Sequence, residues 1–228
     1  MSDSKNVLAI SIDGVIRDLF EQFDNVYRKK FIKNPGLVGM NEKYEYVPDE
    51  DEEDEFKRLE TKANALIHLP MTTYSLMNHY EFESVDVFNK FMFQDHALEL
   101  FGSAGQVPFS MENANKLYVI KSELGLDEVI LFCPGEQQTI TATLHFCVRN
   151  GCKIGHIIFD TNPLNIWNHA NIVITENPNI IDAKPKDGRV IKINKEYNIN
   201  NTADLNLDDL KKISYRMLEN FIKNNKYE

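Results

Sequence analysis

The chain has 228 residues, of which 43% are hydrophobic and 11% aromatic, so it can bury a substantial core and is not disordered throughout. Its formal net charge of -10, from 35 acidic and 25 basic residues, argues against a surface that follows nucleic-acid phosphates, although a local basic groove is compatible with it. The sequence contains no apolar run of bilayer length and no signal peptide, so we expect a cytoplasmic protein that binds neither membrane nor nucleic acid directly.

The N-terminal segment is typical of the first half of a strand-helix unit. Residues 7–12 form a continuous apolar run that predicts a buried strand, and the Asp-Gly pair that follows supplies the chemistry of a turn. From Ile16, apolar residues recur at spacings of three and four. This spacing predicts an amphipathic helix to about Ile32, before an Asn-Pro-Gly stop.

Residues 37–110 differ in character and predict a helical insertion. The acidic block PDEDEEDEF at 48–56 is typical of a solvated loop. Apolar spacing predicts three helices, at about 56–67, 85–92 and 96–101. The aromatic segment 87–93 is expected in the core of this insertion rather than at an interface, and GSAGQ at 102–106 is expected to be the hinge that leads out of it.

From residue 111 onward, strands and helices alternate. Strands are predicted at 128–133, 154–160, 171–175 and 189–193, and helices at about 113–124, 138–149, 164–169 and 206–222. Such alternation indicates a parallel sheet with helices on both faces and a ligand site at the carboxyl ends of the strands. We therefore expect an α/β core formed by 1–36 and 111–228, with 37–110 as an inserted cap.

The cysteines and histidines do not indicate a zinc site or a disulfide framework. The three cysteines, Cys133, Cys147 and Cys152, are an odd number without a CxxC pair, so buried thiols are expected. The six histidines show neither HxxxH nor HExxH spacing.

The stretch LAISIDGVIRD at 8–18 resembles the first motif of the haloacid dehalogenase (HAD) superfamily, an apolar strand followed by Asp-x-Asp-Gly-(Thr/Val). A helical insertion after the first strand-helix unit resembles the cap of HAD nucleotidases. The layout is similar to nucleotidase-like HAD proteins of bacteriophages. The resemblance implies a HAD-like, Rossmann-type parallel sheet with helices on both faces and a helical cap.

The resemblance also assigns positions to the parts of a phosphoryl-transfer site. Cys133 ends a strand where the family has Ser or Thr, Thr139 lies near the helix start where it has Lys, and Asp160 lies where it has its last acidic residue. Ser11 stands at the position of the nucleophilic Asp, and Asp13 stands at that of the general acid/base.

Phosphoryl transfer through an enzyme intermediate requires a carboxylate nucleophile, a second acid, Mg²⁺, and a hydroxyl and a lysine that hold the phosphate oxygens. A serine without an adjacent base is a poor nucleophile, and a thiol is a weak donor. Because several parts are replaced together, we expect a vestigial site at Ser11, Asp13, Cys133, Thr139 and Asp160 with little catalysis.

Three hypotheses for the function follow. The first is a degenerate HAD-like protein with a structural role or with protein partners, such as a component of a phage virion or tail, for which no cofactor is expected. The second is a Mg²⁺-dependent nucleotidase or phosphatase in which Asp13 activates water and Asp13 and Asp160 hold the metal. The third is a sensor that binds a nucleotide or phosphate without cleaving it, with Lys153 or Arg17 as the cation.

Overall fold

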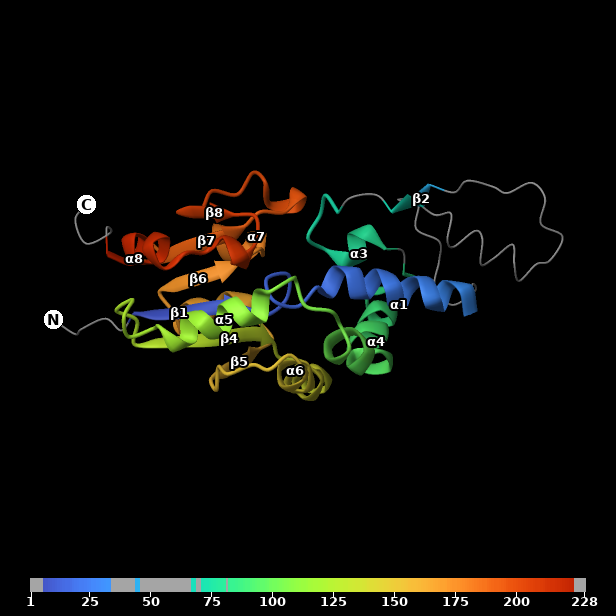
Figure 1. Cartoon of the computed structure of the whole chain (residues 1–228). Helices are drawn as coiled ribbons and strands as arrows, with labels where there is room; N and C mark the ends of the chain where they lie inside the picture. The colour runs from blue at the N-terminus through green and yellow to red at the C-terminus, as the bar shows by residue number, and fades with distance from the viewer. Residues whose placement is uncertain (1–5, 34–43, 46–66, 69–70, 81, 224–228) are drawn as a thin grey trace.

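The computed structural model describes residues 6–33, 44–45, 67–68, 71–80 and 82–223 (Figure 1). Its centre is a six-stranded sheet with the order β5-β4-β1-β6-β7-β8, in which every neighbouring pair is parallel. The strands are β1 (Val7–Ser11), β4 (Glu128–Pro134), β5 (Ile157–Asp160), β6 (Ile172–Thr175), β7 (Arg189–Ile193) and β8 (Leu205–Leu207). The predicted parallel α/β sheet is confirmed.

Helices and short helical turns connect the strands. The α-helices are α1 (Leu19–Lys33), α3 (Leu76–His79), α4 (Val85–Lys90), α5 (Ser110–Val119), α6 (Gln137–Arg149), α7 (Pro178–Asp182) and α8 (Tyr215–Lys223). The described residues also form two π-helical turns, η1 (Phe91–Asp95) and η2 (Leu98–Gly102), and three 3₁₀ turns, η3 (Pro163–Asn168), η4 (Glu196–Asn198) and η5 (Leu210–Lys212). A separate antiparallel pair joins β2 (Tyr44–Glu45) to β3 (Ile67–His68).

The sheet is covered on both faces, which explains the continuous apolar run of β1. Leu8 and Ile10 belong to one buried cluster, together with residues of α5, α6 and α8. Val7 and Ala9 belong to a second cluster, which includes Ile166 of η3 and Ile180 of α7. Because alternate side chains of a strand face opposite sides, a strand buried on both sides needs apolar residues at every position.

A third cluster lies beyond the carboxyl end of β1, where Figure 1 shows α1, α3 and α4 grouped at one end of the sheet. Phe23 of α1 is fully buried, and its ring centroid lies 4.8 Å from that of Tyr80 and 5.6 Å from that of Phe91. Phe91 and Met92 are buried, which confirms segment 87–93 as core of this unit. Helix α1 therefore packs with the cap elements, although the sequence groups it with the core. The domain boundaries predicted from the sequence, 1–36 and 111–228 for the core and 37–110 for the cap, stay a prediction.

The structure corrects the predicted start of the first helix. After Gly14 the chain makes a closed turn, in which the backbone N–H groups of Ile16 and Arg17 both donate to the carbonyl of Ile12, at 2.9 and 2.8 Å. Ile16 packs in the sheet core, and α1 begins only at Leu19. Ile16, whose apolar side chain suggested the start of a helix, thus belongs to the turn.

The predicted terminal helix is also corrected. Its first part is the edge strand β8, because Leu205 and Leu207 alternate with a polar residue and pair in parallel with β7. Asp209 then accepts a hydrogen bond from the backbone N–H of Lys212 and caps η5, and α8 begins at Tyr215.

Several expectations concern the insertion. The acidic block 48–56 and nearly all of the predicted helix 56–67 lie outside the described residues, but the last residue of that helix, Ile67, lies in strand β3. The predicted helix at 96–101 is formed as the π-helical turn η2. Within the described part of the chain, none of the helices combines the length and the apolar character needed to cross a membrane.

Candidate functional site at the carboxyl edge of the sheet

Strands β1 and β6 lie side by side, and a hydrogen bond joins the residues that end them. The hydroxyl of Ser11 donates to Oγ1 of Thr175 at 2.9 Å, and Ser11 is 7% exposed. Thr175 Oγ1 also accepts from the backbone N–H of Asn177 at 3.1 Å, which starts the next turn. Ser11 therefore connects two strand ends within the protein.

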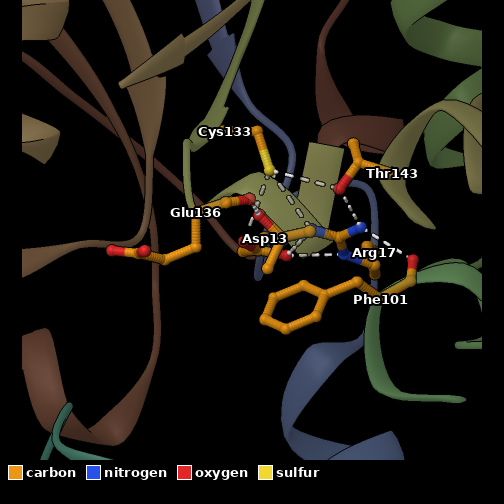
Figure 2. A network of polar contacts seen from close by, with 7 residues as sticks. Asp13, Arg17, Phe101, Cys133, Glu136 and Thr143 are labelled. Carbon is orange, nitrogen blue, oxygen red and sulfur yellow. Dashed lines mark hydrogen bonds and ion pairs between the residues drawn. The ribbon is translucent and has the colours of Figure 1, made fainter. Parts of the chain in front are cut away.

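Asp13 and Arg17 form the charged centre of the site, which Figure 2 shows from close by. Nε and Nη2 of Arg17 each lie 2.6 Å from Oδ1 of Asp13, across the closed turn that follows β1. The Arg17 side chain is fully buried, whereas that of Asp13 is 12% exposed. Burial alone would lower the pKa of Arg17, but the contacts with Asp13 and Cys133 together outweigh it, and the net pKa lies above its usual value.

The Arg17 guanidinium is engaged inside the protein through all three of its nitrogens. Nη1 donates to the carbonyl of Phe101 at 2.8 Å and to Oγ1 of Thr143 at 2.9 Å. Nε donates to Oδ1 of Asp13, and Nη2 donates to Sγ of Cys133 at 3.3 Å and also lies in ion-pair contact with Asp13. Arg17 is therefore held by partners within the protein rather than left for a bound phosphate.

Cys133 ends the buried part of β4 beside this pair, as its position in the sequence predicts. Burial, and next the Asp13 carboxylate, raise the pKa of Cys133 to about 12, so its thiol stays protonated. Thr143 Oγ1 lies 3.5 Å from Cys133 Sγ. The polar centre therefore includes a threonine that the sequence prediction did not contain.

Thr139, the predicted member on α6, has another contact. Its hydroxyl donates to the carbonyl of Glu136 at 2.6 Å, within the first turn of the helix. The carboxylate of Glu136 points away from Arg17 in Figure 2. Thr143 lies one turn further along the same helix face, so the helical spacing of four residues is the signal that identifies it.

Asp160 is not part of this centre, which corrects the predicted pairing with Asp13. It ends β5, and β4 separates β5 from β1. Its Oδ1 accepts from the backbone N–H of Asn162 at 2.9 Å, and its Oδ2 accepts from Nδ2 of Asn165 at 3.0 Å. These hydrogen bonds lower the pKa of Asp160. Asp160 shapes the turn into η3, the structural alternative that its Asp-Thr-Asn-Pro sequence also indicates.

Glu176 takes the place that was expected for Asp160. It directly follows β6, the strand next to β1, and is 1% exposed. Burial raises the pKa of Glu176 to about 8, so the carboxyl is mostly protonated at neutral pH. Its Oε2 has no hydrogen-bond partner in the described part of the chain. In the sequence, Glu176 is recognisable as an acidic residue directly after an apolar strand. Asp160 has the same pattern.

Lys153, the other predicted cation, lies elsewhere. It is exposed and precedes β5, so it lies toward the amino ends of the strands, opposite to the carboxyl ends where Asp13 and Glu176 lie. Its backbone N–H donates to Oδ1 of Asn115 at 2.7 Å.

A cavity of about 370 Å³ lies between the carboxyl edge of the sheet and the cap elements. Asp13 and Glu176 line its sheet side, and Tyr74 lies close to both. Its remaining wall is mainly apolar and comes from α1, α3, α4, η1 and η2. None of the described residues that line it is Lys, Arg or His.

The residues at this edge do not fit the Mg²⁺ that the HAD resemblance implies. Mg²⁺ binds ionised carboxylate oxygens, but Oδ1 of Asp13 is paired with Arg17 and Glu176 is mostly protonated at neutral pH. The hydroxyl of Ser11 is committed to Thr175, and Asp160 is held in its own turn. Within the described residues, no three His, Cys, Asp or Glu side chains are grouped as a metal site would need.

Comparisons with known proteins identify the fold. No protein-family model and no curated protein matches the sequence. A HAD hydrolase of family IA, variant 3, from Entamoeba histolytica superposes with a TM-score of 0.54 at 12% identity, covering 96% of this chain and 100% of that one. A haloacid dehalogenase-like hydrolase from Burkholderia xenovorans superposes with a TM-score of 0.52 at 7% identity, covering 97% of this chain and 96% of that one. At these identities the similarity shows a HAD-like fold.

Proposed function

We propose that this HAD-like chain binds a small molecule in the cavity between cap and sheet and does not transfer phosphoryl groups. The observation that carries this proposal is the Asp13–Arg17 ion pair, in which the cation is fully buried and all three guanidinium nitrogens have partners inside the protein. The two charged groups that phosphoryl chemistry would use are neutralised by each other. What remains open to a ligand is the apolar cavity beside them.

The other parts of the site support the same conclusion. Ser11 has no adjacent base, and its hydroxyl is bonded to Thr175, so it is a poor nucleophile. Stabilising the charge of a transferring phosphoryl group requires cations or free donors aimed at its oxygens. The described cavity wall contains no basic side chain, and the carboxylate of Asp13 would repel a phosphate.

Protein partners and a role in a phage virion or tail stay predictions from the sequence resemblance. No contact described above bears on them. A small-molecule site and a protein partner are compatible, because the cavity occupies only the space between the cap elements and the sheet edge.

A HAD-type phosphatase is the second candidate, because one observation favours it. Asp13 exposes part of its carboxylate, and both Asp13 and Glu176 line the same cavity. In this alternative, Asp13 would accept a proton from an attacking water and Glu176 would donate one to the leaving group.

Turnover measurements distinguish the two candidates. Release of phosphate is measured from p-nitrophenyl phosphate and from a panel of nucleoside monophosphates with Mg²⁺, for the native chain, Ser11→Asp and Asp13→Asn. Glu112→Gln, on the exposed face of α5, is the matched control for a change of charge away from the site. We expect no turnover in any of them. Native turnover that Asp13→Asn abolishes and Glu112→Gln preserves would establish the phosphatase instead.

A further inference from the structure

Building on the proposed binding function, we propose that the cavity takes a small, largely apolar molecule whose uncharged head group carries both a hydrogen-bond acceptor and a donor, as a primary amide does. The acceptor of the head group faces Glu176 and its donor faces Asp13. The structure therefore assigns the site to a neutral ligand rather than to the phosphate ester of a phosphatase.

The apolar part of the ligand follows from the cavity wall. Aromatic and methionine side chains dominate it on the cap side: Phe20, Met77, Phe88, Met92, Phe93 and Phe101. A volume of about 370 Å³ lies within the range of small-molecule sites and accommodates a substituted aromatic ring. Such walls bind apolar surface through burial and dispersion, with ring stacking or sulfur contacts to an aromatic ligand.

Glu176 indicates where a hydrogen-bond acceptor of the ligand would lie. Its side chain is almost completely buried, it lines the cavity, and Oε2 has no hydrogen-bond partner in the described part of the chain. Buried polar atoms are nearly always hydrogen-bonded, so an unpartnered one at a cavity requires an explanation. A protonated carboxyl donates one hydrogen bond, and a ligand acceptor would satisfy it.

Asp13 indicates where a donor of the ligand would lie. Its Oδ1 accepts a hydrogen bond from Nε of Arg17 and lies 2.6 Å from Nη2. Among the described residues, its Oδ2 has only the long contact with the Cys133 thiol, at 3.9 Å. An ionised carboxylate can accept about four hydrogen bonds, so Oδ2 retains accepting capacity toward the cavity.

The charge balance of this end of the cavity disfavours an ionic head group. Arg17 neutralises Asp13, and Glu176 is mostly uncharged at neutral pH. An anionic head group would lose its hydration without meeting a basic side chain among the described residues of the cavity wall, and a cationic one would compete with Arg17 for Asp13. A neutral head group has neither the cost of desolvating a charge nor the competition with Arg17.

Four titratable groups face Glu176 from the elements packed around it. Asp13, on the turn after β1, raises its pKa and Lys195, just before η4, lowers it. Tyr74 and Tyr197 lie close enough to Glu176 that its charge helps to raise the pKa of both phenols, so both stay uncharged through the neutral range. Glu176 is therefore the group whose ionisation changes the charge of this end of the cavity between neutral and alkaline pH.

Four probes with the same aromatic body test the head group. Affinities of benzamide, benzoate, benzylamine and phenyl phosphate are measured calorimetrically at pH 6.5 on the full chain. We expect benzamide to bind at least about tenfold more tightly than each charged probe, a difference of about 1.4 kcal/mol. Equal or tighter binding of a charged probe, or no binding of benzamide at millimolar concentration, would overturn the proposal.

The pH dependence of benzamide binding tests the role of Glu176 and needs no variant. The affinity of the native chain should fall between pH 6.5 and pH 9, because ionised Glu176 can no longer donate. Glu176→Gln, which keeps a neutral donor, should bind benzamide with an affinity that does not change over this interval. A native affinity that is constant with pH would contradict the assignment. Phosphate turnover, measured separately, would refute the binding function itself, whereas these affinities refute only the ligand class.

Discussion

Arg17 Nη2 lies 2.6 Å from Asp13 Oδ1, so a permanent cation with a fully buried side chain is paired with the acid of the first sequence motif. The rings of Phe101 and Phe146 lie 4.9 and 5.4 Å from the guanidinium carbon and exclude water from it. A buried ion pair is costly to desolvate, and breaking it leaves an uncompensated charge. This relationship links the stability of the chain to the geometry of its candidate site.

The first prediction concerns this ion pair. Arg17→Met should lower the free energy of unfolding by about 3–5 kcal/mol, because it leaves the Asp13 carboxylate and the Phe101 carbonyl without their donors. Urea denaturation followed by circular dichroism measures the change. Adding Asp13→Asn to Arg17→Met should restore part of the loss, because the unpaired charge is removed.

A matched control for this prediction is the exposed pair of Lys116 and Glu112, which has the same spacing of four residues. Lys116→Met should change the free energy of unfolding very little, since solvent screens exposed ion pairs. If Arg17→Met were as mild as Lys116→Met, the buried pair would not have the structural role assigned to it.

The second prediction concerns Gly14, which has a φ of 69° directly after Asp13. A Cβ at this position would overlap the carboxyl group of Glu176. Gly125 has a φ of 71°, and no atom lies within 4 Å of a Cβ placed there. Gly125→Ala should therefore cost only the backbone strain, about 1–2 kcal/mol. Gly14→Ala should cost more, because Glu176 must also move. Equal losses in urea denaturation would show that Glu176 does not pack against the turn.

The third prediction is a dependence of stability on pH. The pKa of Glu176 is about 8 in the folded chain and about 4.5 for an unperturbed glutamate, so the unfolded chain binds fewer protons between these values. The contribution of protonated Glu176 is complete below pH 4.5 and is lost as the pH rises toward 8, so stability falls across this interval. Glu176→Gln cannot ionise and should flatten this part of the profile. Denaturation of both proteins at several pH values measures it, and parallel profiles would contradict the raised pKa.

Strand order explains why the sequence located part of the site and missed its second acid. Asp160 and Glu176 each follow an apolar strand and each precede an Asn-Pro turn, so the local pattern does not separate them. Only the pairing of β6 with β1 brings Glu176 next to Asp13. That pairing is a non-local property, whereas Ser11 and Asp13 are placed by their own strand and turn.

At two places the local sequence pattern fits two different structures, and tertiary contacts decide which one forms. Ile16 and Arg17 fit the start of a helix, but the closed turn at Ile12 uses them for the sheet core and for the ion pair. Leu207 fits a helix by its spacing to Leu210 and a strand by its spacing to Leu205, and pairing with β7 selects the strand. In contrast, β1 and β4 are apolar at nearly every position, so the sequence predicts them as buried strands without ambiguity.

The last prediction concerns the reactivity of the cysteines. A hydrogen bond from the Cys147 thiol lowers the pKa of Cys152, which is partly exposed. The same interaction and burial raise the pKa of Cys147, and burial raises the pKa of Cys133. Because the thiolate is the nucleophile, iodoacetamide at pH 7.5 should label Cys152 first in the folded chain, as peptide mass spectrometry measures.

Two variants test the cause of this reactivity. Cys152→Ser should leave the folded chain essentially unlabelled over the same time, because Cys133 and Cys147 are both buried. Cys147→Ala removes the thiol that stabilises the Cys152 thiolate, so it should slow the labelling of Cys152 without unfolding the chain. Faster labelling of Cys133 than of Cys152 would mean that the polar centre around Arg17 opens to solvent, which would contradict the buried network on which the proposed function rests.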